Sequence, residues 1–261
     1  MDLHDKIIVV TGGGNGIGRA LCRRFAADHP RAIVVADIDA EGARRVASEI
    51  GGTAVETDVS READIQRLVK QTLDRHGAID LFCSNAGIAR NGDQSAPDAE
   101  WTQCWDIHVM AHVFAARAVL PGMLDRGNGY LLHTVSAAGL LSHPQSATYA
   151  VTKHASLAFA EWLSIAYGER GIKVSALCPQ GVRTDMLMRE RPAADRASVG
   201  QAMLVDGAVE PEYVAELVVQ GIAEERFLIL PHPEVAEYVR RRAADHDRWL
   251  RGMRKLRRSQ T

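Results

Sequence analysis

Residues 7–18 read Ile7-Ile8-Val9-Val10-Thr11-Gly12-Gly13-Gly14-Asn15-Gly16-Ile17-Gly18. The first four are apolar and β-branched, which is typical of a strand buried on both faces of a parallel sheet. Residues 19–26 then have the apolar spacing of a helix. A glycine turn between a strand and a helix lets the backbone approach a phosphate, which the free N–H groups and the dipole of the helix attract. A glycine run alone also suits a flexible turn, but this placement favours a phosphate-binding turn.

The spacing of the glycines in this turn is G-x-x-x-G-x-G, with Gly12, Gly16 and Gly18 in the fixed positions, rather than the better-known G-x-G-x-x-G. The next expected strand covers residues 32–36 and ends at Asp37, nineteen residues beyond Gly18. A carboxylate in that place can accept hydrogen bonds from an adenosine ribose and would repel a 2′-phosphate. It therefore favours NAD over NADP. The alternative is that Asp37 caps a helix that begins near Asp39.

Strands and helices alternate through the rest of the chain. We expect further strands at 53–57, 79–83, 130–135, 172–178 and 227–230, with helices at about 60–76, 97–125, 149–170 and 211–224. This alternation predicts one α/β domain over residues 1–261, with a doubly wound parallel sheet of about seven strands and helices on both faces.

Two later segments do not fit the alternation. Residues 185–209 lack clear periodicity and are interpreted as a substrate-binding loop, in which Met186, Met188 and Met203 either adapt to an apolar ligand or pack in the core. Residues 233–258 are arginine-rich with interspersed apolar residues, which indicates an amphipathic helix. We prefer the interpretation that this helix is solvated or contacts another subunit over the alternative that it binds an anionic partner.

The composition sets limits on function and location. The net charge of −2 and sequence pI near 6.6 point to neither a nucleic-acid nor a membrane partner, although the last 22 residues are locally basic. Four cysteines lie far apart and never form C-x-x-C, so we expect no metal site and no disulfide framework. The N-terminus lacks the features of a signal peptide, which favours a cytoplasmic protein.

Tyr149 and Lys153 are the residues most suited to chemistry. They lie four residues apart at the start of a helix-compatible run, so their side chains share one helical face. A fixed positive charge favours the phenolate and can lower a tyrosine pKa of about 10 by roughly 1–3 units. The phenol could then exchange a proton with an alcohol or a carbonyl. Taken alone, the pair is more often a half-buried aromatic beside a solvated lysine.

Small residues follow the strand expected at 79–83, where the chain reads Ser84-Asn85-Ala86-Gly87. They leave room for a flat ligand at the carboxyl end of that strand. In an open α/β sheet, ligands bind at this edge.

Taken in order, these motifs resemble those of the short-chain dehydrogenase/reductase family over nearly the whole chain. The match comprises the turn at Thr11–Gly18, Asp37, Asp58-Val59, Asn85–Gly87, Ser136, and the Tyr149/Lys153 pair, with Ser136 thirteen residues before Tyr149. The resemblance implies a Rossmann-type domain that uses NAD to interconvert a secondary alcohol and a ketone.

The resemblance also implies the roles of the site residues. Tyr149 would be the acid/base, Lys153 would lower its pKa and hold the nicotinamide ribose, and Ser136 would hydrogen-bond the substrate oxygen. Gly12, Asn15, Gly16, Ile17 and Gly18 would surround the pyrophosphate, Asp58 and Val59 would meet the adenine, Val182 and Thr184 would bind the carboxamide, and Asn85, Ala86, Gly87 and Pro179 would complete the cofactor site. The resemblance implies a homotetramer or a dimer, in which the helices expected at 97–125 and 149–170 pack against their copies. Both stretches are apolar over more than one face.

The chain departs from the family in two places. His108 stands where the family usually has an asparagine that positions a water in a proton relay, and Pro179-Gln180 stands where the family usually has Pro-Gly. A histidine can donate and accept, so His108 is a candidate for the relay and would then titrate near neutrality. The positive charges of Lys153 and the oxidised nicotinamide should lower its pKa below the reference value of about 6.5 and keep the ring neutral at working pH. His108 also fits a second hypothesis, a weak or idle dinucleotide-binding sensor on the same fold.

The substrate is predicted only as a class. The segments 88–96, 137–148 and 185–209 are expected to shape its pocket, and they are rich in Ala, Leu, Met and Gly with few charges. Such a lining favours an apolar cyclic, aromatic or long-chain secondary alcohol.

Overall fold

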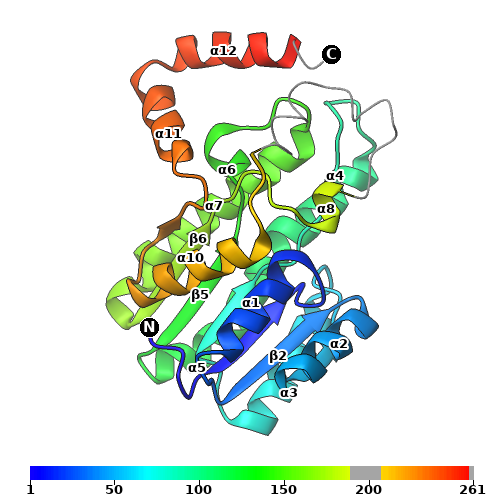
Figure 1. The fold of residues 1–261 in the computed structure, drawn as a ribbon, viewed down its shortest axis with the longest axis vertical. Coiled ribbons are helices and arrows are strands. Elements are labelled where there is room, and N and C mark those ends of the chain that lie inside the picture. The colour runs from blue at the N-terminus through cyan, green and yellow to red at the C-terminus, as the bar shows by residue number, and fades with distance from the viewer. Residues whose placement is uncertain (189–206, 259–261) are drawn as a thin grey trace.

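A seven-stranded parallel sheet forms the centre of the molecule (Figure 1). The computed structural model describes residues 1–188 and 207–258, so Met203 and most of the 185–209 segment lie outside the described residues. The strand order is β3-β2-β1-β4-β5-β6-β7. The strands are β1 (Ile7–Thr11), β2 (Ala32–Asp37), β3 (Thr53–Glu56), β4 (Leu81–Ser84), β5 (Gly129–Thr134), β6 (Ile172–Leu177) and β7 (Leu228–Ile229). The predicted doubly wound fold is confirmed.

Helices cover both faces of this sheet. They are α1 (Gly16–Ala26), α2 (Ala40–Ile50), α3 (Glu62–His76), α4 (Asp98–Trp105), the π-helix η1 (Asp106–Met110), α5 (Ala111–Asp125), α6 (Ala138–Leu141), α7 (Ala147–Tyr167), the 3-10 turn η2 (Gly168–Arg170), α8 (Asp185–Met188), α10 (Pro211–Ala223), α11 (Glu234–Ala244) and α12 (His246–Arg258).

Alternate residues of the strands build two hydrophobic cores. Ile8 and Val10 of β1 pack with α1, α2 and α10, whereas Val9 packs with α3, α5 and α7. This is the period of two that a strand covered on both faces requires. The order of strands reverses direction between β1 and β4, which places a crevice at the carboxyl ends of these two strands.

Several elements differ from the sequence expectations. The helix expected over 97–125 contains the π-helical turn η1, and the helix expected over 233–258 is two helices that meet at Asp245. Asp245 has extended backbone and its side chain accepts a hydrogen bond from the N–H of Arg248, 2.8 Å away, so it ends α11 and caps α12. Strand β7 has two residues rather than four, and the short helix α6 was not expected.

The helical stretch Asp98–Asp125 is long and apolar enough, by length and composition alone, to cross a membrane. Half of its most apolar window is buried against the rest of the chain, as in the core helix of a globular domain. It is therefore weak support for a membrane span.

Candidate active site

The glycine turn after β1 exposes the N-terminus of α1. Gly12 and Gly16 have φ of +63° and +50°, a conformation that favours glycine. A Cβ at Gly18 would lie 2.0 Å from the carbonyl oxygen of Gly12, so only glycine lets the helix start this close to the turn. Asn15 caps α1, because its side chain accepts a hydrogen bond of 2.8 Å from the N–H of Gly16. These features fit a pyrophosphate held by backbone N–H groups.

Asp37 lies at the end of β2 beside this turn. Its carboxylate accepts hydrogen bonds of 2.9 Å from the N–H of Gly14 and of 2.9 Å from the N–H of Asp39. The cap of α2 is Asp39, which accepts hydrogen bonds from the N–H groups of Glu41 and Gly42. The alternative that Asp37 caps this helix is therefore wrong, and Asp37 is left facing the crevice next to the glycine turn.

One cavity of about 1430 Å³ joins the two groups of residues singled out in the sequence. It exceeds the roughly 300–1,000 Å³ of a usual ligand pocket, so it has room for a cofactor and a second molecule. The predicted residues that line it are Gly12, Asn15, Gly16, Ile17, Asp37, Asp58, Val59, Asn85, Ala86, Gly87, Ser136, Tyr149, Lys153, Pro179, Val182 and Thr184. Gly18 and His108 are the two predicted site residues that do not line it.

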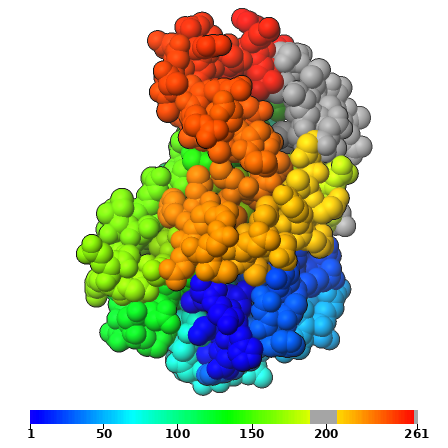
Figure 2. All heavy atoms as spheres, turned by 60° about the vertical axis from the view of Figure 1, so that its left-hand side comes forward, coloured from blue at the N-terminus to red at the C-terminus, as the bar shows by residue number. Residues whose placement is uncertain are grey.

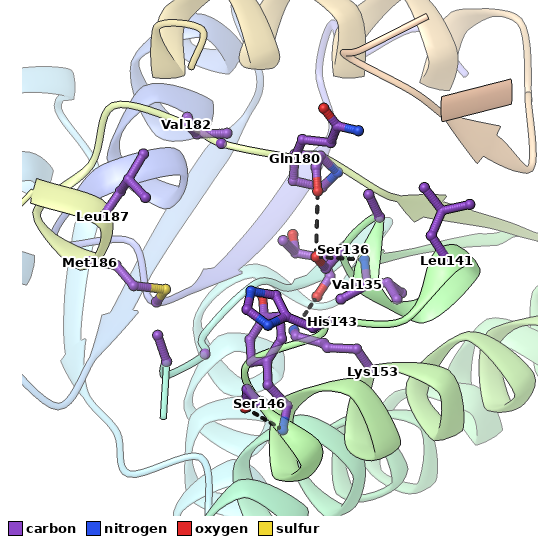
Figure 3. A pocket seen from close by; sticks show the side chains of 18 of the residues that line it. Val135, Ser136, Leu141, His143, Ser146, Lys153, Gln180, Val182, Met186 and Leu187 are labelled. Atoms are coloured by element: carbon purple, nitrogen blue, oxygen red, sulfur yellow. Dashed lines mark hydrogen bonds between the residues drawn. The ribbon is translucent and has the colours of Figure 1, made fainter. Parts of the chain in front are cut away.

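Ser136, Tyr149 and Lys153 come together where β5 ends and α7 begins. The Ser136 hydroxyl accepts a hydrogen bond of 3.1 Å from the N–H of Ala138, and Lys153 Nζ donates one of 3.0 Å to the Thr134 carbonyl. Lys153 Nζ also lies 5.6 Å from the centroid of the Tyr149 ring. Figure 3 shows Ser136 and Lys153 converging on the same part of the cavity, with His143 beside them.

The start of α7 is fixed by its own cap. The Ser146 hydroxyl accepts a hydrogen bond of 3.2 Å from the N–H of Tyr149. Because the helix begins at Ala147, the phenol sits in its first turn and the ammonium one turn later, on the same face.

Burial dominates the ionisation of these groups. It lowers the pKa of Lys153 to about 8. It also raises the pKa of Tyr149, with the Ser136 hydroxyl acting in the opposite direction. The expectation that Lys153 leaves Tyr149 with a lowered pKa is therefore wrong for the protein without a bound cofactor, because the loss of water around the phenol outweighs the other effects.

His108 lies behind the cavity wall rather than in it. Its ring is fully buried, with Nδ1 2.8 Å from the Thr152 hydroxyl and Nε2 3.1 Å from the N–H of Ile88. Burial, followed by the charge of Lys153, holds its pKa well below the usual value of 6.5. The expected lowering of the His108 pKa is therefore confirmed in direction, with burial rather than charge as its main cause, and the imidazole is neutral at pH 7.

Gly87 lies close to both His108 and Lys153. A Cβ at Gly87 would lie 3.7 Å from His108 Nε2 and 3.8 Å from Lys153 Nζ. Both nitrogens therefore lie near the same backbone position, just beyond the carboxyl end of β4.

The loop after β6 keeps its turn despite the Pro-Gln sequence. The Pro179 carbonyl accepts a hydrogen bond of 2.8 Å from the N–H of Ala137, which ties the loop to the segment that follows Ser136. The N–H of Gln180 donates to His232 Nδ1 at 3.2 Å, and the Gln180 side chain lines the cavity (Figure 3).

Some residues of the cavity lining come from the segments expected to shape the substrate pocket, and others were missed in the sequence. Leu141 and His143 belong to the 137–148 segment, and Met186 belongs to α8, whereas Met188 does not line the cavity. The largest omission is the C-terminal pair of helices, which contributes the apolar residues Tyr238, Trp249, Met253 and Leu256. Their spacing marks an apolar helix face, but no sequence signal says what that face contacts.

Comparisons with known proteins agree with this geometry. A family model described as short chain dehydrogenase matches residues 6–195. The chain is 35% identical over 243 residues to a 1-deoxy-11-beta-hydroxypentalenate dehydrogenase of Streptomyces exfoliatus, a match that covers 90% of this chain and 86% of that protein. It is 37% identical over 196 residues to a 2,5-dichloro-2,5-cyclohexadiene-1,4-diol dehydrogenase of Sphingobium indicum, covering 72% of this chain and 77% of that protein.

A solved structure shares the fold over almost its full length. It is a short chain dehydrogenase/reductase from Burkholderia phymatum in complex with NAD, with a TM-score of 0.84 and 31% sequence identity. The superposition covers 95% of this chain and 96% of that chain.

Proposed function

Because the chain belongs to the short-chain dehydrogenase family, we propose that it is an NAD-dependent oxidoreductase that interconverts a secondary alcohol and a ketone. The observation that carries this proposal is the single cavity that joins the glycine turn and Asp37 to Ser136, Tyr149 and Lys153. Such a cavity suits a dinucleotide at one end and a small molecule at the other.

The residues at the glycine turn fit NAD. Gly12, Gly16 and the N-terminus of α1 supply a close-approaching backbone for the pyrophosphate, and Asp37 supplies acceptors for the adenosine ribose. NAD, when bound, accepts or delivers the hydride. The complex of the Burkholderia phymatum protein with NAD supports the same choice of cofactor.

The proton is handled by Tyr149 and its neighbours. With a raised pKa, the phenol is protonated at pH 7, which is the form that donates a proton to a ketone oxygen. Ser136 lines the same cavity, and we expect its hydroxyl to hydrogen-bond the same oxygen and fix its position. Lys153, with a pKa of about 8, is mainly charged at pH 7 and adds positive charge next to the phenol. In the oxidative direction Tyr149 accepts the proton, so oxidation is expected to speed up as the pH rises.

The substrate class follows from the lining near Ser136. Val135, Leu141, Met186 and Leu187 are apolar and line the cavity (Figure 3). The two curated relatives are named for hydroxylated ring compounds. We therefore propose a cyclic, apolar secondary alcohol as the substrate, in line with the apolar class expected from the sequence.

A spectrophotometric screen tests this function. Cyclic secondary alcohols of increasing size, beginning with cyclohexanol, are offered with NAD, and the corresponding ketones are offered with NADH. We expect formation or consumption of NADH with at least one pair. Tight binding of NAD without turnover of any pair would instead favour the idle sensor.

A further inference from the structure

The C-terminal helices α11 and α12 form an arm that stands apart from the sheet, beyond the carboxyl ends of the strands (Figures 1 and 2). No residue of α12 is buried. Its three half-buried residues are Trp249, Met253 and Leu256, and all three line the cavity. They lie at positions i, i+4 and i+7, which is one stripe of the helix. The apolar face of α12 is thus turned toward the cavity.

The arm is attached to the segment that carries Ser136. Val235 of α11 is fully buried against Ala137 and Leu141. The ring of Tyr238 lies 6.4 Å from that of Trp249, measured between centroids. Arg242 donates to the carbonyl of Leu140. These contacts fix α11 against α6, so the wall made by α12 has a defined position relative to the reacting groups.

The charged residues of α12 are exposed and mostly basic: Asp247, Arg248, Arg251, Arg254, Lys255, Arg257 and Arg258. Of these, only Arg248 lines the cavity. Close to the cavity, the charges on the arm include both signs, with Glu234 and Asp245 alongside Arg241 and Arg248, and Arg241 is paired with Glu237 at 2.8 Å. The arm therefore offers the cavity an apolar surface without a clear excess of either charge.

We infer that the arm is the outer wall of the substrate compartment, and that Trp249, Met253 and Leu256 contact the part of the substrate farthest from its hydroxyl. This inference rests on the proposed function. It names an extended, apolar alcohol, larger than one six-membered ring, as the preferred substrate. An apolar helix face that met only water would disfavour this placement of α12, whereas contact with an apolar substrate stabilises it. The three side chains are therefore specificity-determining residues.

Two substitutions on neighbouring positions of α12 test the inference. Trp249→Ala removes a cavity-lining ring, and Leu250→Ala removes an apolar side chain of the same helix that is 41% exposed and does not line the cavity. For each variant and the parent, kcat/KM is measured with cyclohexanol and with cyclododecanol as probes. Met253→Ala repeats the test without changing the contact between Tyr238 and Trp249.

We expect kcat/KM for cyclododecanol to fall about tenfold in Trp249→Ala and somewhat less in Met253→Ala, because buried apolar contacts of this size are worth at least one tenfold step. The values for cyclohexanol should stay within about twofold, as should both values in Leu250→Ala. Equal losses for the two alcohols, or equal effects of the Trp249 and Leu250 substitutions, would overturn the inference.

Binding without turnover separates this inference from the proposed function. Calorimetry of cyclododecanone with the protein and NAD is run on the same variants. If no alcohol is oxidised but the ketone binds the parent and binds Trp249→Ala about tenfold more weakly, the wall is supported while the proposed reaction fails. If the ketone neither binds nor turns over in the parent, the inference is wrong.

Discussion

The neutral His108 ring can take either of two tautomers within the same set of contacts. With the proton on Nδ1, it donates to the Thr152 hydroxyl, 2.8 Å away, and Nε2 accepts from the N–H of Ile88. With the proton on Nε2, the ring donates to the Ile88 carbonyl, 3.0 Å away, and Nδ1 accepts from Thr152. A ring that is satisfied in both tautomers can take a proton at one nitrogen and release it at the other.

We therefore predict that His108→Asn keeps most of the oxidation rate, because an amide also donates and accepts, whereas His108→Ala lowers the rate by interrupting the path to Lys153. The pKa of His108 is lowered, so the fall in kcat that its protonation causes should lie well below pH 6.5, and the ring stays neutral above that range. The measurement is kcat against pH for the three proteins. Identical profiles in all three would reduce His108 to a packing residue.

We predict that Asp37 sets the preference between NAD and NADP. Its carboxylate would face the 2′-phosphate of NADP as a like charge in a partly desolvated site, so kcat/KM should be much higher with NAD. Asp37→Ala should narrow this gap, but it also removes the acceptor of the Gly14 N–H. Asp37→Asn is the better control, because it removes the charge and keeps an acceptor. Equal kcat/KM for NAD and NADP in the parent would sink the prediction.

At the scale of elements, α5 and β5 meet through two fully buried histidines. His112 Nδ1 lies 2.9 Å from His133 Nδ1, and neither Nε2 has a hydrogen-bond partner among residues 1–188 and 207–258. Burial lowers the pKa of His133 to about 4 and holds that of His112 well below 6.5. Both rings are therefore neutral at pH 7, with one Nδ1–H shared between them.

This pair should make the stability of the fold depend on pH. Unfolded His133 binds its proton from about pH 6.5, but folded His133 binds it only near pH 4, so stability is fully present above pH 6.5 and lost as the pH falls from there. The lowered pKa of His112 acts in the same direction. His133 alone corresponds to a loss on the order of 3 kcal/mol. Urea unfolding at pH 7.5, 6 and 5 should show a smaller loss in the His112→Leu/His133→Leu variant. The exposed-site control His246→Gln should lose as much free energy of unfolding between pH 7.5 and 5 as the parent. The same loss in the double variant would refute the assignment.

The helices α5 and α7 were also expected to meet copies of themselves in a homotetramer or dimer. Val109, Val119, Leu157 and Leu163 are buried in the core instead, and Val113, Phe114 and Phe159 are half-buried. The exposed large apolar residues of α7 are Val151, Trp162 and Ile165, and Ile165 is 83% exposed. The predicted contact between subunits should therefore involve these three side chains.

Ile165→Asp should therefore shift the protein to a smaller species in analytical ultracentrifugation, because a carboxylate cannot be buried unpaired in an apolar contact. Leu73→Asp, on the exposed side of α3, is the matched control and should leave the assembly unchanged. A parent protein that sediments as a stable monomer at micromolar concentration would contradict the prediction.

Strands were easier to predict than the interruptions of helices. Ile7–Val10 and the core of β2 are apolar β-branched runs, a local signal that the buried parallel sheet requires. The π-helical turn at Asp106–Met110 depends on how the helix packs, and the periodicity of the sequence does not show it. The short helix α6 has only four residues, too few for a periodic pattern.

At the scale of the whole molecule, the cavity lies at the point where the strand order changes direction, between β1 and β4. Motif spacing along the chain was enough to predict which residues of the strand ends and of α7 gather there. It could not predict that the arm of α11 and α12 reaches the same cavity. An amphipathic pattern identifies which side of a helix is apolar, but tertiary structure decides what that side meets.

Ionisation was likewise beyond the sequence. The pair of Tyr149 and Lys153 suggested a lowered tyrosine pKa, but burial of the whole site raises it and lowers that of the lysine to about 8. Desolvation depends on everything that packs around a group, including segments far away in the chain. The pKa values of Tyr149 and Lys153 therefore depend on the packing of the whole folded protein and cannot be inferred from their spacing alone.

The role of Tyr149 as the proton carrier is tested most directly by the effect of Tyr149→Phe on the oxidation of a cyclic alcohol by NAD. The substitution keeps the ring and removes the proton carrier, and Tyr167→Phe, at the far end of the same helix, serves as the control. We predict that kcat falls by about 10²-fold or more in Tyr149→Phe while the Kd for NAD is unchanged, and that Tyr167→Phe keeps the parent kcat. Retained turnover in Tyr149→Phe would show that the phenol is not the proton carrier.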